Sequence, residues 1–132
     1  MFTEAEIKAA HSKVLSGADF PAYIRDIKEL GVNNYETFVI DGHAVFHGAN
    51  GYEIVTASKY VNLKVADSSD PEALRDIIKI HQAGQTDYPT FCTQVAAIGV
   101  EKWVVDTHRL MCTYYDLAGN EMVAEPIPEI SY

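Results

Sequence analysis

The sequence predicts an α+β protein in which two pseudo-symmetric helix–helix–β-meander repeats form an antiparallel sheet covered by helices. Three observations lead to this prediction. Segments with helical apolar spacing precede segments rich in β-branched and aromatic residues, this order occurs twice, and the two occurrences align without a gap at an offset of 68 residues. Residues 1–132 are expected to form a single domain with internal repeats at about 3–66 and 70–127.

The repeat consists of helix caps, turns and apolar anchors. Similar residues match at the offset, among them Tyr35 and Trp103, which are both expected in the core. Composition alone would give roughly two identities over such a stretch. The offset gives seven: Asp19/Asp87, Pro21/Pro89, Gly31/Gly99, Val32/Val100, Gly51/Gly119, Glu53/Glu121 and Val55/Val123. One supersecondary unit used twice produces this pattern.

Each repeat is expected to begin with a helix. Thr3 and Glu6 have the spacing of a capping box in front of a helical run of apolar residues. Asp70-Pro71 marks the corresponding start in the second repeat. Aspartate accepts hydrogen bonds from first-turn amides, and proline lacks an amide where none is needed.

The second helix of each repeat has a signal at both ends. Asp19 and Asp87 are expected to be N-caps, each followed two residues later by proline. Gly31 and Gly99 are expected to end the helices in the left-handed conformation, in which a larger residue would be strained.

Each helix pair is followed by a predicted antiparallel meander. Its strands are expected at "NYETFVI" (34–40), "HAVFHG" (43–48) and from Tyr52, and again at "EKWVVDT" (101–107), "LMCTYYD" (110–116) and from Glu121. The alternation in "YVNLKVA" (60–66) favours a fourth strand in the first repeat, and Pro126 and Pro128 predict an irregular edge at the end of the second. Whether the strands form one sheet or two stays open.

The composition indicates an acidic, soluble, cytoplasmic protein. The net charge of −9 disfavours nucleic acid and anionic membranes as partners. No apolar run approaches the ~18 residues that span a bilayer, and "MFTEAEIKAA" at the N-terminus lacks the pattern of a signal peptide. Cys92 and Cys112 have no metal-site spacing and are expected to be buried thiols.

Three stretches carry a family resemblance: "IKAAHSKVLSGADFPAYI", "GVEKWVVD" and "CTYYDLAGNE". They resemble the bacterial domain-of-unknown-function family DUF1398, whose members are often labelled "phage envelope protein". The resemblance runs from Phe2 to about Ile127. It implies a small bacterial, sometimes phage-related protein with no established activity and no catalytic residues to assign. The envelope label would lead one to expect a signal peptide, a membrane segment or low-complexity coat features.

One face of the predicted sheet is the candidate ligand or partner surface. In the second strand of each meander, Ala44 and Phe46 and their counterparts Cys112 and Tyr114 are expected to face the core. The opposite face is amphipathic rather than charged, which fits either ordinary half-exposed sheet residues or a subunit interface, or else a shallow ligand or partner surface. Its residues are His43, Val45, His47, Met111, Thr113 and Tyr115, to which the turn glutamates Glu53 and Glu121 are added.

The residue spacing favours neither a metal site nor a catalytic centre. His43 and His47 would be about 13 Å apart along a strand, too far for one ion. Glu53 and Glu121 could form a carboxylate dyad if the repeats met, but turn glutamates that are solvated or bonded within their own hairpins explain them better. No cofactor motif is found. The preferred function is a non-enzymatic protein-interaction or self-association module. The alternative is a small-molecule binding protein or unrecognised enzyme with a cleft between the halves.

Overall fold

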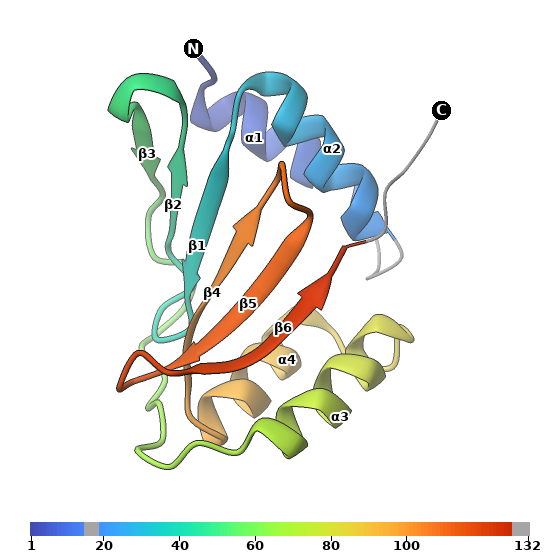
Figure 1. Cartoon of the computed structure of the whole chain (residues 1–132), viewed down its shortest axis with the longest axis vertical. Coiled ribbons are helices and arrows are strands. Elements are labelled where there is room, and N and C mark those ends of the chain that lie inside the picture. Colours follow the sequence, from blue (N-terminus) through green and yellow to red (C-terminus); the bar gives the residue numbers. More distant parts are fainter. Residues whose placement is uncertain (15–18, 128–132) are drawn as a thin grey trace.

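The computed structural model describes residues 1–14 and 19–127. Within these ranges it is an α+β structure with four α-helices and a six-stranded antiparallel sheet (Figure 1). Along the chain the elements are α1 (Glu4–His11), α2 (Phe20–Leu30), β1 (Asn34–Phe38), β2 (Ala44–His47), a short 3₁₀ turn η2 (Ala49–Gly51), β3 (Glu53–Val55), α3 (Pro71–Gln82), α4 (Tyr88–Ala97), β4 (Val100–Asp106), β5 (Met111–Asp116) and β6 (Glu121–Pro126).

The strands form one sheet in the order β3-β2-β1-β4-β5-β6. Each meander is therefore a run of three neighbouring strands, and the two runs join where β1 pairs antiparallel with β4. Glu36 lies opposite Val104 at the middle of this central ladder, and Phe38 lies opposite Lys102 near its end. The sequence left open whether there is one sheet or two, because pairing between distant strands has no local signal.

The helices pack on one face of the sheet, which carries the core. Tyr23 of α2 contacts Tyr35 of β1 edge to face, and Phe91 of α4 contacts Trp103 of β4 in the same way. Both strand residues are buried, as expected, with 4% and 7% of their surfaces exposed. In Figure 1, α1 and α2 lie toward one end of the strands, and α3 and α4 lie toward the other.

Local cap signals correctly predict three of the helix starts. Thr3 and Glu6 form the reciprocal capping box of α1. Asp70 accepts a hydrogen bond from the Ala73 amide at 3.1 Å, and Asp87 accepts one from the Thr90 amide at 2.8 Å. Each of these bonds satisfies an amide that the helix itself leaves without a partner.

The prediction that Asp19 caps α2 is wrong. Asp19 occupies the N-cap position, but its side chain makes no capping hydrogen bond. Its backbone is already helical, with φ −87° and ψ −7°. A capping residue usually has an extended backbone, from which its side chain can accept a hydrogen bond from an amide of the first turn. The helical backbone at this position explains why the shared Asp-x-Pro pattern predicts only one of the two caps.

Two strand predictions also change. Residues 60–66 are not a strand but an irregular strap that joins the two halves. In this strap the Leu63 amide donates to the Ile40 carbonyl, and the Ala66 amide donates to the carbonyl of Ala96 at the end of α4. The last strand continues as far as Pro126, because a proline is tolerated at the outer edge of a sheet, although its register with β5 shifts between Tyr114 and Tyr115. Pro128 lies outside the described residues.

The predictions of buried thiols and of glycine turns are confirmed. Cys92 and Cys112 are buried free thiols. Gly51 and Gly119 have positive φ, and Asp116 accepts a hydrogen bond from the Asn120 amide to close the β5–β6 turn.

None of the helices in the described part of the chain is long and apolar enough to cross a membrane.

Gly31 and Gly99 should differ in their tolerance of a side chain. Both have the predicted positive φ, 109° and 95°. A Cβ at Gly31 would lie 3.7 Å from a ring carbon of Phe2, so Gly31→Ala should lower the free energy of unfolding by about 1 kcal/mol through backbone strain alone. A Cβ at Gly99 would lie 2.1 Å from the carbonyl oxygen of Ser68, so Gly99→Ala should cost roughly 3 kcal/mol. Urea denaturation measures both, and equal losses would contradict this difference.

Candidate functional site

The candidate site is the sheet face that the helices leave uncovered, here called the open face. Burial alternates along the strands, so the residues next to the buried core positions are half-buried or exposed and point to this face. It includes all eight residues that the sequence assigns to a surface: His43, Val45, His47, Glu53, Met111, Thr113, Tyr115 and Glu121. It also includes Glu36, Phe38, Lys102 and Val104 from the two central strands.

A row of ionisable side chains crosses the middle of the open face. Lys102 Nζ donates to Glu36 Oε2 at 2.8 Å across the β1–β4 ladder. On the other side, His47 Nε2 lies 3.3 Å from Glu36 Oε1, and His47 Nδ1 lies 3.6 Å from Glu53 Oε2. The charges at the centre therefore have partners within the face.

The pKa values of the central pair reflect this contact. Burial raises the pKa of Glu36, but hydrogen bonds from Lys102 and His47 outweigh it, so the pKa lies below its usual range. The hydrogen bond to Glu36 raises the pKa of Lys102. Both groups are thus held in their charged forms at neutral pH. The sequence offered no sign of this pair, because its partners are 66 residues apart and meet only when β1 and β4 adjoin.

Aromatic rings surround the lysine. The Phe38 ring stacks on the His43 ring with centroids 4.5 Å apart and planes inclined by only 5°. Lys102 Nζ lies 5.6 Å from the centroid of Phe38 and 5.9 Å from that of Tyr115, within cation–π range. The open face thus combines apolar rings with a charge that is already neutralised.

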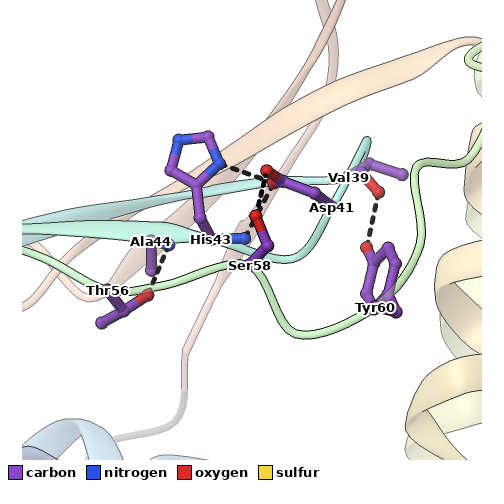
Figure 2. Close-up of polar contacts among 7 residues, drawn as sticks. All are labelled: Val39, Asp41, His43, Ala44, Thr56, Ser58 and Tyr60. Atoms are coloured by element: carbon purple, nitrogen blue, oxygen red, sulfur yellow. Dashed lines mark hydrogen bonds and ion pairs between the residues drawn. The ribbon is translucent and has the colours of Figure 1, made fainter.

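The β1–β2 hairpin brings three polar residues together at one end of the open face (Figure 2). Asp41 Oδ1 lies 2.6 Å from His43 Nδ1, and Asp41 Oδ2 accepts a hydrogen bond from the Ser58 hydroxyl at 2.8 Å. Burial raises the pKa of Asp41, but hydrogen bonds from the His43 amide, the His43 ring and Ser58 lower it by more. Since a carboxylate only accepts, the His43 ring donates this hydrogen bond through its Nδ1–H.

These three residue types also occur in hydrolytic triads, but they are connected differently here. In a triad the serine hydroxyl contacts the imidazole, and the imidazole contacts the carboxylate. Here the carboxylate lies between the other two, and the Ser58 hydroxyl donates to Asp41 instead of to His43 (Figure 2). The arrangement fixes the hairpin to the loop that follows β3, but it does not activate Ser58 as a nucleophile.

A shallow hollow of about 380 Å³ opens beside Tyr115. Residues of β4, the end of β5 and the β5–β6 turn line it. Its lining residues are Glu101, Lys102, Val104, Tyr115, Leu117, Ala118 and Gly119. The hollow lies within the second meander, whereas the junction between the halves is occupied by the β1–β4 ladder.

The structure does not bring Glu53 and Glu121 together. They lie on β3 and β6, which are the opposite edges of the sheet, so the carboxylate-dyad interpretation is wrong. Glu53 contacts His47 instead. Within residues 1–14 and 19–127, no three or more His, Cys, Asp and Glu side chains converge as metal ligands would.

Comparison with known proteins identifies the family. A family model described as "Protein of unknown function (DUF1398)" matches residues 8–126. The match covers most of the chain, and the protein belongs to this family of uncharacterised proteins.

A curated relative is similar to part of the chain. It is the uncharacterized protein YcgX of Escherichia coli (strain K12), with 25% identity over 65 residues. The alignment covers 49% of this chain and 48% of the relative, so the chain spans about half the length of the curated protein that it matches. Neither match carries the phage envelope label.

The Glu36–Lys102 pair predicts a specific dependence of stability on pH. The lowered pKa of Glu36 stabilises the fold above the unfolded-state value of about 4.3, and this stabilisation is lost as the pH falls through the folded-state pKa. Glu36→Gln should therefore lower the free energy of unfolding by about 1 kcal/mol at pH 7, and by much less near pH 3. Urea denaturation from pH 3 to 7 measures this.

Glu121→Gln is the matched control for this measurement, because Glu121 is exposed on the same face. Its effect should be small at every pH. If Glu36→Gln destabilised the protein equally at pH 3 and pH 7, the ion pair would not be the source of the loss.

Proposed function

We propose that the protein is a protein-interaction module that uses its open face to bind another protein or a second copy of itself. One observation carries this proposal: among residues 1–14 and 19–127, helices cover only one face of the six-stranded sheet, yet its other face is amphipathic. Antiparallel sheets with one solvated face ordinarily alternate apolar and polar residues cleanly. Here the uncovered face holds Phe38, Val45, Val104 and Tyr115 around a neutralised ion pair.

The chemistry of the face supports binding rather than catalysis. The side chains that could act as acid or base are engaged in contacts that organise the sheet, as in Glu36 with Lys102 and Asp41 with His43 and Ser58. A non-enzymatic role fits these contacts. Two buried free thiols fit a reducing compartment, so a cytoplasmic location belongs to the same proposal.

A small-molecule site is the second candidate, and the hollow beside Tyr115 favours it. Its volume of about 380 Å³ is at the lower end of the range for ligand pockets, roughly 300–1,000 Å³. Lys102 and Glu101 would orient a polar ligand over the aromatic ring. Thermal-shift screening against metabolites tests this candidate, and Tyr115→Ala should abolish any stabilisation that a true ligand produces.

We also propose that the two halves are copies of one helix–helix–meander unit. The strand registers support this. At the offset of 68, the pair Glu36/Val104 maps onto itself, and the pair Tyr35/Phe46 maps onto Trp103/Tyr114, which are also partners. An approximate two-fold axis would then pass through the central ladder.

If the halves are copies, the equivalent core residues Tyr35 and Trp103 should contribute similarly to the free energy of unfolding. Tyr35→Ala and Trp103→Ala should each lower the free energy of unfolding by about 3–5 kcal/mol, because each empties a large buried site. Urea denaturation of both variants measures these losses. A loss below about 1 kcal/mol at either position would contradict their equivalence.

Photo-crosslinking tests the interaction proposal directly. A benzophenone amino acid at Thr113, on the open face, should give protein adducts of discrete mass in the expressing cell, while the same amino acid at Glu72, exposed on α3, should not. Mass spectrometry distinguishes an adduct with another protein from one with a second copy.

A second substitution shows whether the surface itself is responsible. Val104→Gln removes an apolar side chain next to Thr113 in the sheet and should reduce the Thr113 adducts without altering the circular dichroism spectrum. Equal adducts from Thr113 and Glu72, or none from Thr113, would overturn the proposal.

A further inference from the structure

The negative charge of the chain is concentrated on the sheet. The two segments that hold the strands, 34–55 and 100–126, contain eight carboxylate side chains and only two basic ones. Segments 1–33 and 56–99, which hold the helices, contain ten carboxylates and eight basic side chains and are nearly balanced. The net charge of −9 is therefore mainly a property of the sheet layer.

On the open face, the carboxylates available to a partner lie toward the edges. In the middle, Glu36 is neutralised by Lys102, and apolar side chains such as Val104 surround the pair. At the β3 edge the Glu53 side chain lies 3.6 Å from His47 Nδ1 but is still 54% exposed, and at the β6 edge Glu121 is exposed. An apolar centre with a charged rim is the usual layout of a protein interface.

We infer that the open face accepts a basic partner: a protein segment with lysine or arginine at both ends of an apolar centre. This inference rests on the proposed function and names the partner class for the same surface. Charge complementarity selects the partner, because opposite potentials accelerate encounter while like charges brought together cost free energy. A second copy would bring the same carboxylate edges against each other, so the occupant is a different protein.

The sheet geometry sets the length of the segment. Five inter-strand steps of about 4.8 Å separate β3 from β6, a span of roughly 24 Å. Glu53 lies in the row of Asp106 and Glu121 lies in the row of Lys102, about 13 Å further along the strands, so the two glutamates are roughly 27 Å apart. An extended chain rises about 3.3 Å per residue, so seven residues cover roughly 23 Å, and the long side chains of terminal lysines cover the rest. The partner segment runs diagonally across the strands, with its basic ends over these two glutamates and its apolar centre over Val104, which lies midway between their rows.

The groove between α1 and α2 is a weaker acidic surface. Its lining includes Glu6, Asp26 and Glu29 together with Lys13. Arg25 already pairs with Asp26 at 3.1 Å and approaches Glu29 at 3.9 Å, which reduces the charge left for a partner. A basic segment therefore gains more on the open face.

An NMR titration of the full chain tests the inference with a defined probe. The probe is a blocked seven-residue peptide with two lysines at each end and a Val-Tyr-Val centre, and its control carries glutamates in place of the lysines. The lysine peptide should shift the amide signals of Val45, Val104 and Thr113, and the glutamate peptide should not. The Kd of the lysine peptide should rise at least about fivefold from low to high salt, because screening weakens exposed charge contacts.

Substitutions with equal charge change provide the control. The double variant Glu53→Gln with Glu121→Gln should weaken the lysine peptide about fivefold or more. Glu72→Gln with Asp76→Asn on α3 removes the same net charge and should leave the affinity unchanged. Reversing both charges, with Glu53→Lys and Glu121→Lys in one variant, should make the protein bind the glutamate peptide in preference to the lysine peptide.

Several results would overturn the inference. These are shifts confined to the α1–α2 groove, equal binding of the two peptides, no binding of either, or equal weakening by the α3 control variant. If Thr113 gives cross-links in the cell while the lysine peptide shows no preference for the open face, only the basic partner fails. If Thr113 gives no cross-link, the interaction proposal fails whichever peptide binds.

Discussion

Main-chain pairing between β1 and β4 is the constraint on which the rest of the structure depends. These strands are the only place where the two meanders meet within the described sheet. Bonds beyond the ladder reinforce both of its ends. At one end the buried Thr107 hydroxyl donates to the carbonyl of Val32 at 2.7 Å and lies 2.9 Å from that of Asn33, and at the other the Val39 amide donates to the Glu101 carbonyl. Without this ladder, each half would be a three-stranded meander with an unpaired inner edge, which is a marginal structure on its own.

The same pairing determines what each face of the sheet can do. Each helix pair covers its own meander, so joining the meanders edge to edge places all the helices on one side and produces a continuous core. The other face becomes one continuous surface across all six strands. Its central ion pair exists only because Glu36 and Lys102 lie on adjoining strands. The candidate site is therefore a product of the topology rather than of any local motif.

This origin explains what the sequence could and could not predict. Caps and turns are decided within four residues, so Asp87, Asp70 and the glycines Gly31 and Gly99 were predicted correctly. The alternation of core and surface positions in the strands was also correct, because it follows from the two-residue period of a strand. The ion pair was missed because its residues are 66 positions apart, and the Asp41–His43–Ser58 cluster was missed because Ser58 joins the local Asp41–His43 contact from 17 residues away. The strap at 60–66 resembled a strand because its apolar residues alternate, but its amides bond to a hairpin and a helix end instead of to a neighbouring strand.

The charge pattern also resolves a conflict that an uncovered amphipathic sheet creates. Apolar groups on such a face favour stacking against a second copy, and a sheet edge favours pairing with another strand. The edges here are blunted, since β3 has three residues and β6 ends at a proline. Glu53 and Glu121 place like charges at both margins, so two copies that approach face to face repel each other where a basic partner is attracted. In the proposed interaction, the carboxylates that oppose face-to-face association of two copies would also be the groups that select the partner.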